Sequence, residues 1–335
     1  MDVISLISRR LSGEWGAHWH GPAPLRISPL VIRKTQNRWI MVFFHDRSAL
    51  PFALAKLTTH PGEFPSFFNE FSCLEYLDRS LGSGLAGSIP GPVFQVRHES
   101  VVANVEKMLH GRPVFSPAVW RLGRPFPPVF RSGVNLVLAW WMACVRRLGT
   151  QERDARDFMA GVFEALLRRV QTMYPGERDV ADRIERLGKR FARSSGRGLV
   201  VAPVHGDFWQ GNLLKQGQGL KVFDWERSRI RGLPIFDIYF FCCTLALGSG
   251  ERDGFASCFV KGDWLTGHIG HCIRRASSSL GLQRDEALDL FELFLYEMST
   301  LAMTCFKRKF VHDDEWLDRA MIFRQYRERV ASLIF

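Results

Sequence analysis

One short segment gathers a histidine, two aspartates, an asparagine and a glutamate, in the sequence VHGDFWQGNLLKQGQGLKVFDWERS at 204–228. Asp207 and Asn212 follow the strand-like run LVVAPV, and Asp224 follows the strand-like run LKVF after a QGQG turn. Two strands joined by such a turn form a hairpin, so we expect the three side chains to meet at one sheet edge. Converging oxygen ligands suit Mg²⁺, which completes its shell with water and substrate phosphates. The segment therefore predicts a magnesium site that serves a nucleotide.

The spacing of these residues matches the needs of phosphoryl transfer. One aspartate must meet the acceptor hydroxyl, an asparagine five residues later holds a metal, and an aspartate from the next hairpin strand bridges metal and phosphates. Asp207, Asn212 and Asp224 have these offsets. They are the predicted catalytic base and the two predicted metal ligands.

Three motifs in order carry a family resemblance: HGDFWQGNLL at 205–214, VFDWE at 222–226 and GLPIFD at 232–237. On these motifs the chain resembles the aminoglycoside phosphotransferase and choline kinase superfamily, the small-molecule branch of the protein-kinase-like fold. The resemblance implies ATP or GTP as phosphoryl donor, Mg²⁺, and a small hydroxylated acceptor such as a sugar, an aminoglycoside-like molecule or an amino alcohol.

The resemblance also implies roles for supporting residues around the catalytic loop. It implies that His205 braces the loop by hydrogen bonding and that Asp237 ties it from behind. For Glu226 two roles stay open, a supporting position and a water-mediated contact to the metal.

The first part of the chain supplies the nucleotide-binding residues that the resemblance implies. Lys56 in PFALAKL should contact the phosphates and be held by Glu70 of FFNEFSCLEYL, with Glu75 as the competing partner. A lysine in an otherwise apolar strand is costly without a partner. The run VEKMLHG looks like the interlobe hinge, where backbone groups of Lys107 and Leu109 would bind the base.

Some features depart from the family or favour ordinary structure. The turn KTQNR (34–38) contains no glycine, which leaves the phosphate-facing backbone unassigned, although Lys34 or Arg38 would offer charge there. His18 and His20 have no third or fourth metal ligand near them in the sequence, so we interpret them as polar residues of a strand or loop.

The elements that must position these residues change in kind near Gly111. Before it, short β-rich runs surround one helical segment at 64–81, and after it the helical period dominates, as at 154–174 and 285–306. We therefore predict an α+β, protein-kinase-like bilobal fold. Its lobes are a small antiparallel-sheet nucleotide-binding lobe at 1–110 and a larger, mainly helical lobe at 111–335 that carries the catalytic loop and the substrate pocket. The Pro-rich run at 121–130 is interpreted as a loop, and we expect the aromatic-rich segment 115–130 and the helical lobe to shape this pocket.

Composition limits the compartment and the partners. Seven cysteines without a C-x-x-C pair argue against a disulfide framework, and no signal peptide is recognised, so we expect a cytoplasmic protein. The apolar runs 134–145 and 236–247 are too short to span a bilayer, which predicts no transmembrane segment and leaves a peripheral membrane contact open.

The net charge of +11 favours an anionic partner, but no nucleic-acid module is present. Many arginines stand beside acids, as in RDVADRIERLGKR, which is typical of solvated helix faces and makes nucleic acid an unlikely partner. Two functions stay open. The first is an active small-molecule kinase, and the second is a catalytically silent nucleotide-binding pseudokinase or regulatory protein.

Overall fold

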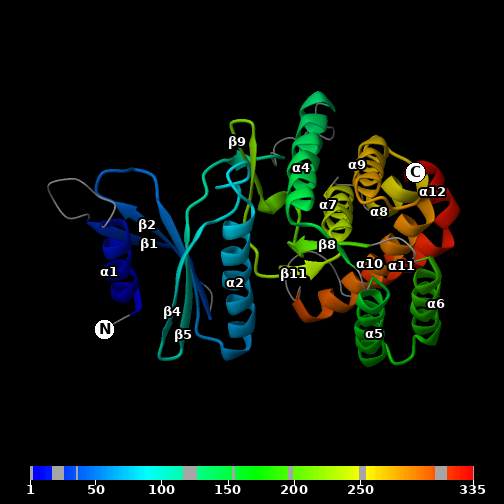
Figure 1. The fold of residues 1–335 in the computed structure, drawn as a ribbon, viewed down its shortest axis with the longest axis horizontal. Coiled ribbons are helices and arrows are strands. Elements are labelled where there is room, and N and C mark those ends of the chain that lie inside the picture. The colour runs from blue at the N-terminus through cyan, green and yellow to red at the C-terminus, as the bar shows by residue number, and fades with distance from the viewer. Residues whose placement is uncertain are drawn as a thin grey trace. The chain divides into compact units, whose positions relative to one another are not determined.

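A computed structural model describes most of the chain (Figure 1). The described residues are 3–16, 26–34, 37–115, 127–152, 155–194, 199–248, 254–305 and 315–334. They divide into two compact units: unit 1 comprises Met1–Arg112 and Asn212–Ile230, and unit 2 comprises Pro113–Gly211 and Arg231–Phe335. The predicted α+β class is confirmed, because unit 1 is built around an antiparallel sheet and unit 2 is mainly helical.

Unit 1 contains a five-stranded antiparallel sheet in the order β1-β2-β3-β5-β4. The elements of its first segment are α1 (Val3–Gly16), β1 (Ile27–Lys34), β2 (Arg38–His45), β3 (Ala53–Thr58), the 3-10 turn η1 (Pro61–Glu63), α2 (Phe64–Ser80), β4 (Pro92–His98) and β5 (Val101–Lys107). Strand β5 inserts between β3 and β4, so β3 and β5 are neighbours although α2 and β4 separate them in the chain.

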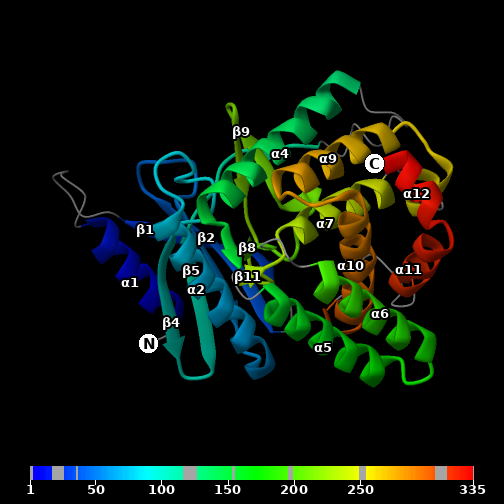
Figure 2. The ribbon, with the colours of Figure 1, turned by 45° about the vertical axis from the view of Figure 1, so that its right-hand side comes forward.

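The two faces of this sheet have different chemistry because side chains alternate along a strand. Helix α1 lies beside the sheet (Figure 2). One face of the sheet packs against α1 through an apolar core, which contains Val3, Ile7 and Leu11 from the helix and, from the strands, Met41, Phe43, Ala53, Ala55, Leu57, Phe94, Val96, Ala103 and Val105. The opposite face lies toward α2 and carries Lys56 and Asn104, which are directly paired across β3 and β5. Polar groups of unit 1 therefore gather on the α2 face.

The second segment of unit 1 is the predicted hairpin, which is confirmed. Strands β9 (Leu213–Gln216) and β10 (Gly219–Val222) pair antiparallel around the turn at Gly217, whose φ of 58° favours glycine. The hairpin joins the first segment through hydrogen bonds from Val222 N–H to the Ser88 carbonyl at 2.8 Å and from Asn69 Nδ2 to the Ser228 carbonyl at 2.6 Å. These contacts explain why residues 212–230 group with unit 1.

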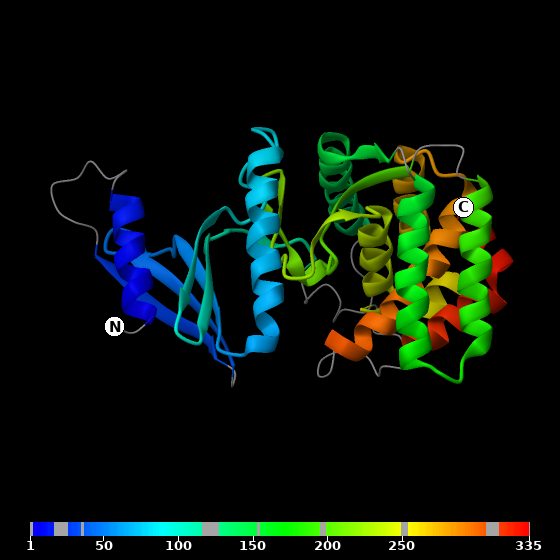
Figure 3. The same ribbon diagram turned by 60° about the horizontal axis from the view of Figure 1, so that its bottom comes forward.

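Unit 2 is mainly helical, with α5 and α6 packed side by side (Figure 3). Its elements are α4 (Pro127–Leu148), β7 (Thr150–Glu152), α5 (Ala155–Met173), α6 (Arg178–Ser194), β8 (Leu199–Val204), α7 (Ile235–Leu247), α8 (Gly254–Ala256), the π-helical turn η3 (Ser257–Lys261), α9 (Thr266–Ser279), α10 (Arg284–Cys305), α11 (Glu315–Gln325) and α12 (Arg327–Ile334). Three short elements lie at the boundaries of the units: β6 (Arg112–Pro113), the 3-10 turn η2 (Gln210–Asn212) and β11 (Arg229–Gly232). The predicted lobes 1–110 and 111–335 stay a prediction.

Helix α7 is apolar around its whole circumference and buried along most of its length, as expected for a core helix. Cys242 and Cys243 are both buried in it. Helix α11 begins at Glu315. His18 and His20 lie outside the described residues.

Helix α4 corrects two sequence-based expectations. Residues 127–130 were predicted to be loop, but they form the first turn of α4. The apolar run at 134–145 was judged too short to span a membrane, yet the helix that contains it has 22 residues. By length and composition α4 is the one described helix that passes for a membrane span, which is weak evidence by itself, and 44% of its apolar window is buried.

Candidate functional site

The polar face of unit 1 is centred on Lys56 of β3. Its Nζ donates hydrogen bonds to Glu70 Oε1 at 2.6 Å and to Asp224 Oδ1 at 3.0 Å. Glu70 is 1% exposed, Lys56 is 15% exposed, and Asp224 is 36% exposed. The structure thus brings together three of the residues predicted for nucleotide and metal binding, with Asp224 the most accessible of them.

The partner of Lys56 is Glu70 and not Glu75. Glu70 occupies the buried side of α2, which faces the sheet, together with Phe67, Cys73, Leu74 and Leu77. Glu75 is half exposed and lies 3.7 Å from the Arg79 side chain on the same helix. The spacing of the apolar residues of α2 therefore decides which glutamate reaches the lysine.

Glu106 of β5 is a further buried acid on this face, and the sequence analysis missed it. It is paired with Leu54 across β3 and β5, two residues from the Lys56–Asn104 pair, so the side chains of Lys56, Asn104 and Glu106 share one face. Glu106 is 5% exposed, and its Oε2 atom has no hydrogen-bond partner. The signal was available, because an acid in the apolar run SVVANVEKML is as costly as a lysine in PFALAKL.

We refer to Lys56, Glu70, Glu106 and Asp224 as the Lys56 cluster. Burial alone would lower the pKa of Lys56, but the carboxyl groups of Glu70, Asp224 and Glu106 raise it well above its usual value. Burial is the main cause that raises the pKa of Glu106 to about 8; Lys56 lowers this pKa, and the negative charges of Glu70 and Asp224 raise it. Burial also raises the pKa of Glu70, against the influence of Lys56. One ammonium group thus faces three acids, and Glu106 carries a proton at neutral pH.

Asn104 fixes the geometry of the cluster from the neighbouring strand. Its Nδ2 donates to the Phe67 carbonyl at 2.8 Å and lies 3.4 Å from Glu70 Oε2, while its Oδ1 accepts from Gln95 Nε2 at 2.8 Å. Asn104 is buried, so these bonds hold β4, β5 and α2 in one arrangement around Glu70. The sequence analysis did not single out Asn104.

Glu226 is engaged by an arginine of the second strand. Arg38 Nη1 lies 2.8 Å from Glu226 Oε2, and Arg38 Nε lies 2.7 Å from Glu63 Oε2. Arg38, one of the two residues considered at the KTQNR turn, therefore bridges β2, η1 and the segment after β10. The side chain of Lys34 lies outside what the structure describes.

The hairpin brings the backbone of Asn212 opposite Phe223, the residue before Asp224. Leu213 pairs with Val222, and Phe223 N–H donates to the Asn212 carbonyl at 3.2 Å, which continues the ladder by one residue. Asp224 then leaves the strand with a φ of 69°, a left-handed conformation that aspartate tolerates better than most residues and that is enriched at functional sites.

The donor set of the hairpin fits a hard cation only in part. Among the described residues, no group of three or more His, Cys, Asp or Glu side chains is placed to hold a metal ion. A carboxylate and an amide oxygen at the end of one hairpin do fit Mg²⁺, which needs only one or two protein ligands when phosphates supply others. Asn212 and Asp224 are the residues that would hold it.

The predicted hinge begins where β5 ends. Lys107 N–H donates to the Gly91 carbonyl at 2.8 Å, and Met108 N–H donates to the Phe52 carbonyl at 2.9 Å. The backbone of Leu109 makes no hydrogen bond within the described part of the chain, so its N–H group is available to a ligand. Glu106 also lies in the predicted hinge run VEKMLHG, directly before Lys107.

The segment around Asp207 in unit 2 is fixed by Asp237 of α7. Asp237 accepts from His205 N–H through Oδ2 at 2.8 Å and from Gly206 N–H through Oδ1 at 3.0 Å. His205 Nδ1 in turn accepts from Asp207 N–H at 3.2 Å, which places a proton of the neutral ring on Nε2. Gly206 has a φ of 75°, a conformation that a side chain would strain.

Apolar contacts complete this loop. Phe208 is fully buried, stacks against Trp140 with ring centroids 5.8 Å apart, and lies 5.9 Å from the ring of His205. Phe208 is anchored in the core and directly follows Asp207, so the backbone of Asp207 is held in place. The roles of Asp207, His205 and Asp237 stay predictions.

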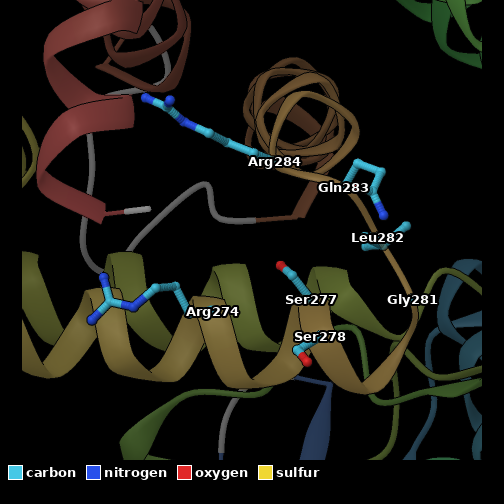
Figure 4. A pocket seen from close by; sticks show the side chains of 7 residues that line it. All are labelled: Arg274, Ser277, Ser278, Gly281, Leu282, Gln283 and Arg284. Carbon is cyan, nitrogen blue, oxygen red and sulfur yellow. The ribbon is translucent and has the colours of Figure 1, made fainter.

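A pocket of about 300 Å³ lies elsewhere in unit 2, between α9 and the start of α10 (Figure 4). It is lined by Arg274, Ser277, Ser278, Gly281, Leu282, Gln283 and Arg284. None of the residues predicted from the sequence motifs lines it.

No family model matches the sequence, and no curated protein matches it either. Solved structures do match. A thermostable mutant of aminoglycoside phosphotransferase APH(4)-Ia in its apo form has a TM-score of 0.54 and 13% identity, with 98% of each chain covered. A ternary complex of a variant of that enzyme with ADP and hygromycin B has a TM-score of 0.55 and 12% identity over the same shares.

Amicoumacin kinase hAmiN, in complex with AMP-PNP, Ca²⁺ and Ami, matches with a TM-score of 0.52 and 13% identity. The match covers 99% of this chain and 96% of the kinase chain. Identities this low demonstrate similarity of fold only. At that level the resemblance predicted from the three motifs is confirmed. The chain has the protein-kinase-like fold of the aminoglycoside phosphotransferases.

Proposed function

We propose that this protein is a small-molecule kinase that transfers the γ-phosphoryl group of ATP or GTP to a hydroxyl group. The observation that carries the proposal is the ion pair of Lys56 with Glu70 at 2.6 Å and with Asp224 at 3.0 Å. A phosphate-binding lysine has to be held and kept charged, and both conditions are met here. The solved structures of similar fold support it, since two of them contain ADP or AMP-PNP with a small-molecule substrate.

In this proposal Asp207 orients the acceptor hydroxyl and accepts its proton. The acceptor oxygen forms a bond to the γ-phosphorus while the bond from that phosphorus to the β-phosphate bridging oxygen breaks. Lys56 neutralises charge on the phosphates, and Glu70 holds it in place. His205 and Asp237 position the backbone on either side of Gly206, so that Asp207 keeps one orientation.

Asn212 and Asp224 would hold Mg²⁺, and Glu226 would support that site from its ion pair with Arg38. When bound, the metal supplies positive charge beside the phosphates. Lys107 and Leu109 would contribute backbone groups to the base, for which the N–H group of Leu109 is available.

The acceptor is proposed only by class, as a small hydroxylated molecule such as a sugar, an aminoglycoside-like molecule or an amino alcohol. Hygromycin B and amicoumacin are the partners of the similar structures, not of this chain. We propose a cytoplasmic enzyme with separate nucleotide-binding and substrate-binding lobes, near 1–110 and 111–335.

The alternative is a nucleotide-binding protein without transferase activity. The Lys56 contacts would be equally compatible with it, because they concern binding. The hydrogen-bonded backbone of His205, Gly206 and Asp207 favours the enzyme, since a silent protein has no need to fix the backbone that carries Asp207.

The proposal is tested by transfer of labelled γ-phosphate from ATP and from GTP to a panel of aminoglycosides, sugars and amino alcohols, with Mg²⁺ present. We expect label in at least one hydroxylated acceptor with wild type and none above background with Asp207→Asn. Nucleotide binding without transfer to any acceptor in a broad panel would favour the silent alternative.

A further inference from the structure

The unpartnered carboxyl group of Glu106 is a feature that the proposed function does not use. An unpaired polar atom that is shielded from water costs free energy, so a buried carboxyl oxygen without a hydrogen-bond partner requires a reason. Oε2 of Glu106 is such an atom, and the side chain is 95% buried, as its 5% exposure shows.

The position of Glu106 suggests what could satisfy it. The side chain shares the α2 face of the sheet with Lys56, which is directed at the phosphates in the proposed function. In the chain, Glu106 comes immediately before Lys107 and three residues before Leu109, whose backbone N–H is unpaired. Consider a nucleotide whose phosphates lie near Lys56 and whose base accepts a hydrogen bond from the Leu109 N–H group. The edge of its base would then lie toward Glu106.

We propose that the carboxyl group of Glu106 selects adenine over guanine by accepting a hydrogen bond from the N6 amino group and donating one to N7. This inference rests on the proposed function and specifies its phosphoryl donor as ATP. Adenine presents a donor and an acceptor at these two positions, and a side-chain amide or a protonated carboxyl group matches them with one acceptor and one donor. Guanine presents two acceptors, O6 and N7, so one oxygen of Glu106 would face another acceptor.

The surroundings of Glu106 keep the proton that this pairing needs. The charged groups that face it are Lys56 from β3, Glu70 from α2 and Asp224 after β10. Burial together with the two acids outweighs the lysine and raises the pKa of Glu106 to about 8. Above that pH the carboxylate can only accept, and it would repel N7.

The test measures dissociation constants of ATP and GTP, with Mg²⁺, at pH 7 and pH 9 for wild type, Glu106→Gln and Glu106→Met. Glutamine keeps one donor and one acceptor in the same shape without a titrating proton, whereas methionine removes both. Glu75→Gln, which neutralises a half-exposed acid on α2, is the matched control. Melting temperatures establish that each variant is folded.

We expect wild type to prefer ATP, and Glu106→Gln to keep that preference. Glu106→Met should reduce the ATP-to-GTP affinity ratio about 5- to 150-fold, the range for one bidentate pairing with a base. ATP affinity of wild type should fall from pH 7 to pH 9 by more than that of Glu106→Gln, since only the glutamate loses a proton. Glu75→Gln should behave as wild type does.

A folded Glu106→Met variant with the wild-type ratio would overturn the assignment of Glu106 and leave the kinase proposal standing. If Glu106→Met does not fold, the pH comparison of wild type with Glu106→Gln decides, and equal pH dependence overturns the assignment. If folded wild type binds neither nucleotide at either pH, the proposed function fails, and the selection of adenine fails with it.

Discussion

Two groups of buried charges in this protein differ in how well they are balanced. The Lys56 cluster in unit 1 sets one cation against three acids and leaves one buried oxygen unpaired. The arginine network in unit 2 joins α6, α10 and α12, and consists of Arg183, Arg190, Asp289, Glu292 and Arg327. There, three guanidinium groups face two carboxylates.

Neither Asp289 nor Glu292 has a fully buried oxygen without a hydrogen-bond partner. Arg183 binds both oxygens of Glu292, at 2.7 and 2.6 Å, and Arg327 reaches Glu292 at 3.2 Å and Asp289 at 2.6 Å. A buried charge that is paired and hydrogen-bonded serves structure, whereas a buried acid with an unpaired oxygen and a pKa raised to about 8 marks a candidate binding site. The comparison therefore assigns fold maintenance to one group and ligand binding to the other.

The largest effect on activity should come from substitution of Asp207, the predicted catalytic base. We expect this substitution to leave stability unchanged. We expect Asp207→Asn to lower kcat by about 10²–10⁴ because the acceptor proton loses its base. Steady-state kinetics with the acceptor identified by the labelling screen, together with melting temperatures, check this. Asp157→Asn, which changes an exposed acid, is the control. Full activity of Asp207→Asn would contradict the role of Asp207 as the base.

Breaking the arginine network should affect stability and not catalysis. Glu292→Gln leaves Arg183 and Arg327 without the buried charge that both contact, so we expect a loss of about 3–5 kcal/mol in the free energy of unfolding. Urea denaturation measures it. Activity per folded molecule should be unchanged; a catalytic defect at full stability would reverse the assignment of the two groups.

Removing the cation of the Lys56 cluster should reduce catalysis more than stability. Lys56→Met leaves Glu70 and Asp224 without their ammonium partner, and we expect kcat/KM to fall about 10²–10³-fold, as for the loss of one preorganised electrostatic donor. The loss of stability should be smaller than for Glu292→Gln, because the acids can take up protons. Kinetics and urea denaturation of the same preparations compare the two variants directly.

The raised pKa of Glu106 makes stability depend on pH. The folded protein retains the proton up to about pH 8, whereas the unfolded chain releases it near the ordinary value of 4.5. The contribution of Glu106 to the free energy of unfolding is therefore fully present below about pH 4.5 and is lost as the pH rises to about 8. We expect the free energy of unfolding of wild type, relative to Glu106→Gln, to decline from pH 5 to pH 8. A constant difference over this range would contradict the raised pKa.

An exposed ion pair should show the smallest change in the free energy of unfolding. Glu164 and Arg168 on α5 are each 66% exposed and lie 2.7 Å apart one turn from each other. Glu164→Ala should change the free energy of unfolding by only about 0.3–0.5 kcal/mol, since water and salt screen such pairs. A loss as large as that of Glu292→Gln would show that burial does not distinguish the pairs.

Much of the hairpin and of the helices could be predicted from local pattern. The runs around QGQG define β9 and β10, and the apolar period of 64–81 places Glu70 on the buried side of α2. The neighbours of Glu106 and Asn104 could not be predicted because they depend on the order of strands: β5 lies beside β3 only because it inserts between β3 and β4. No local pattern specifies that insertion.

The arginine network was also hidden in the sequence. Arg183 and Arg190 belong to a run of mixed charges that was interpreted as a solvated helix face, yet Arg183 is largely buried and pairs with Glu292, more than 100 residues away. Helical period identifies the face on which an arginine lies but not which distant acid packs against that face. The interpretation was wrong at Arg183 for this reason.

The proposed function requires that unit 1 bind a nucleotide with a metal held by Asp224. Thermal unfolding of wild type and Asp224→Ala, with ATP or GTP and with or without Mg²⁺, measures this binding. At about 100 times its dissociation constant the nucleotide should stabilise wild type by about 2.7 kcal/mol. The account predicts a magnesium-dependent rise in Tm that Asp224→Ala removes. If neither nucleotide raises the Tm of folded wild type in the presence of Mg²⁺, the account is contradicted.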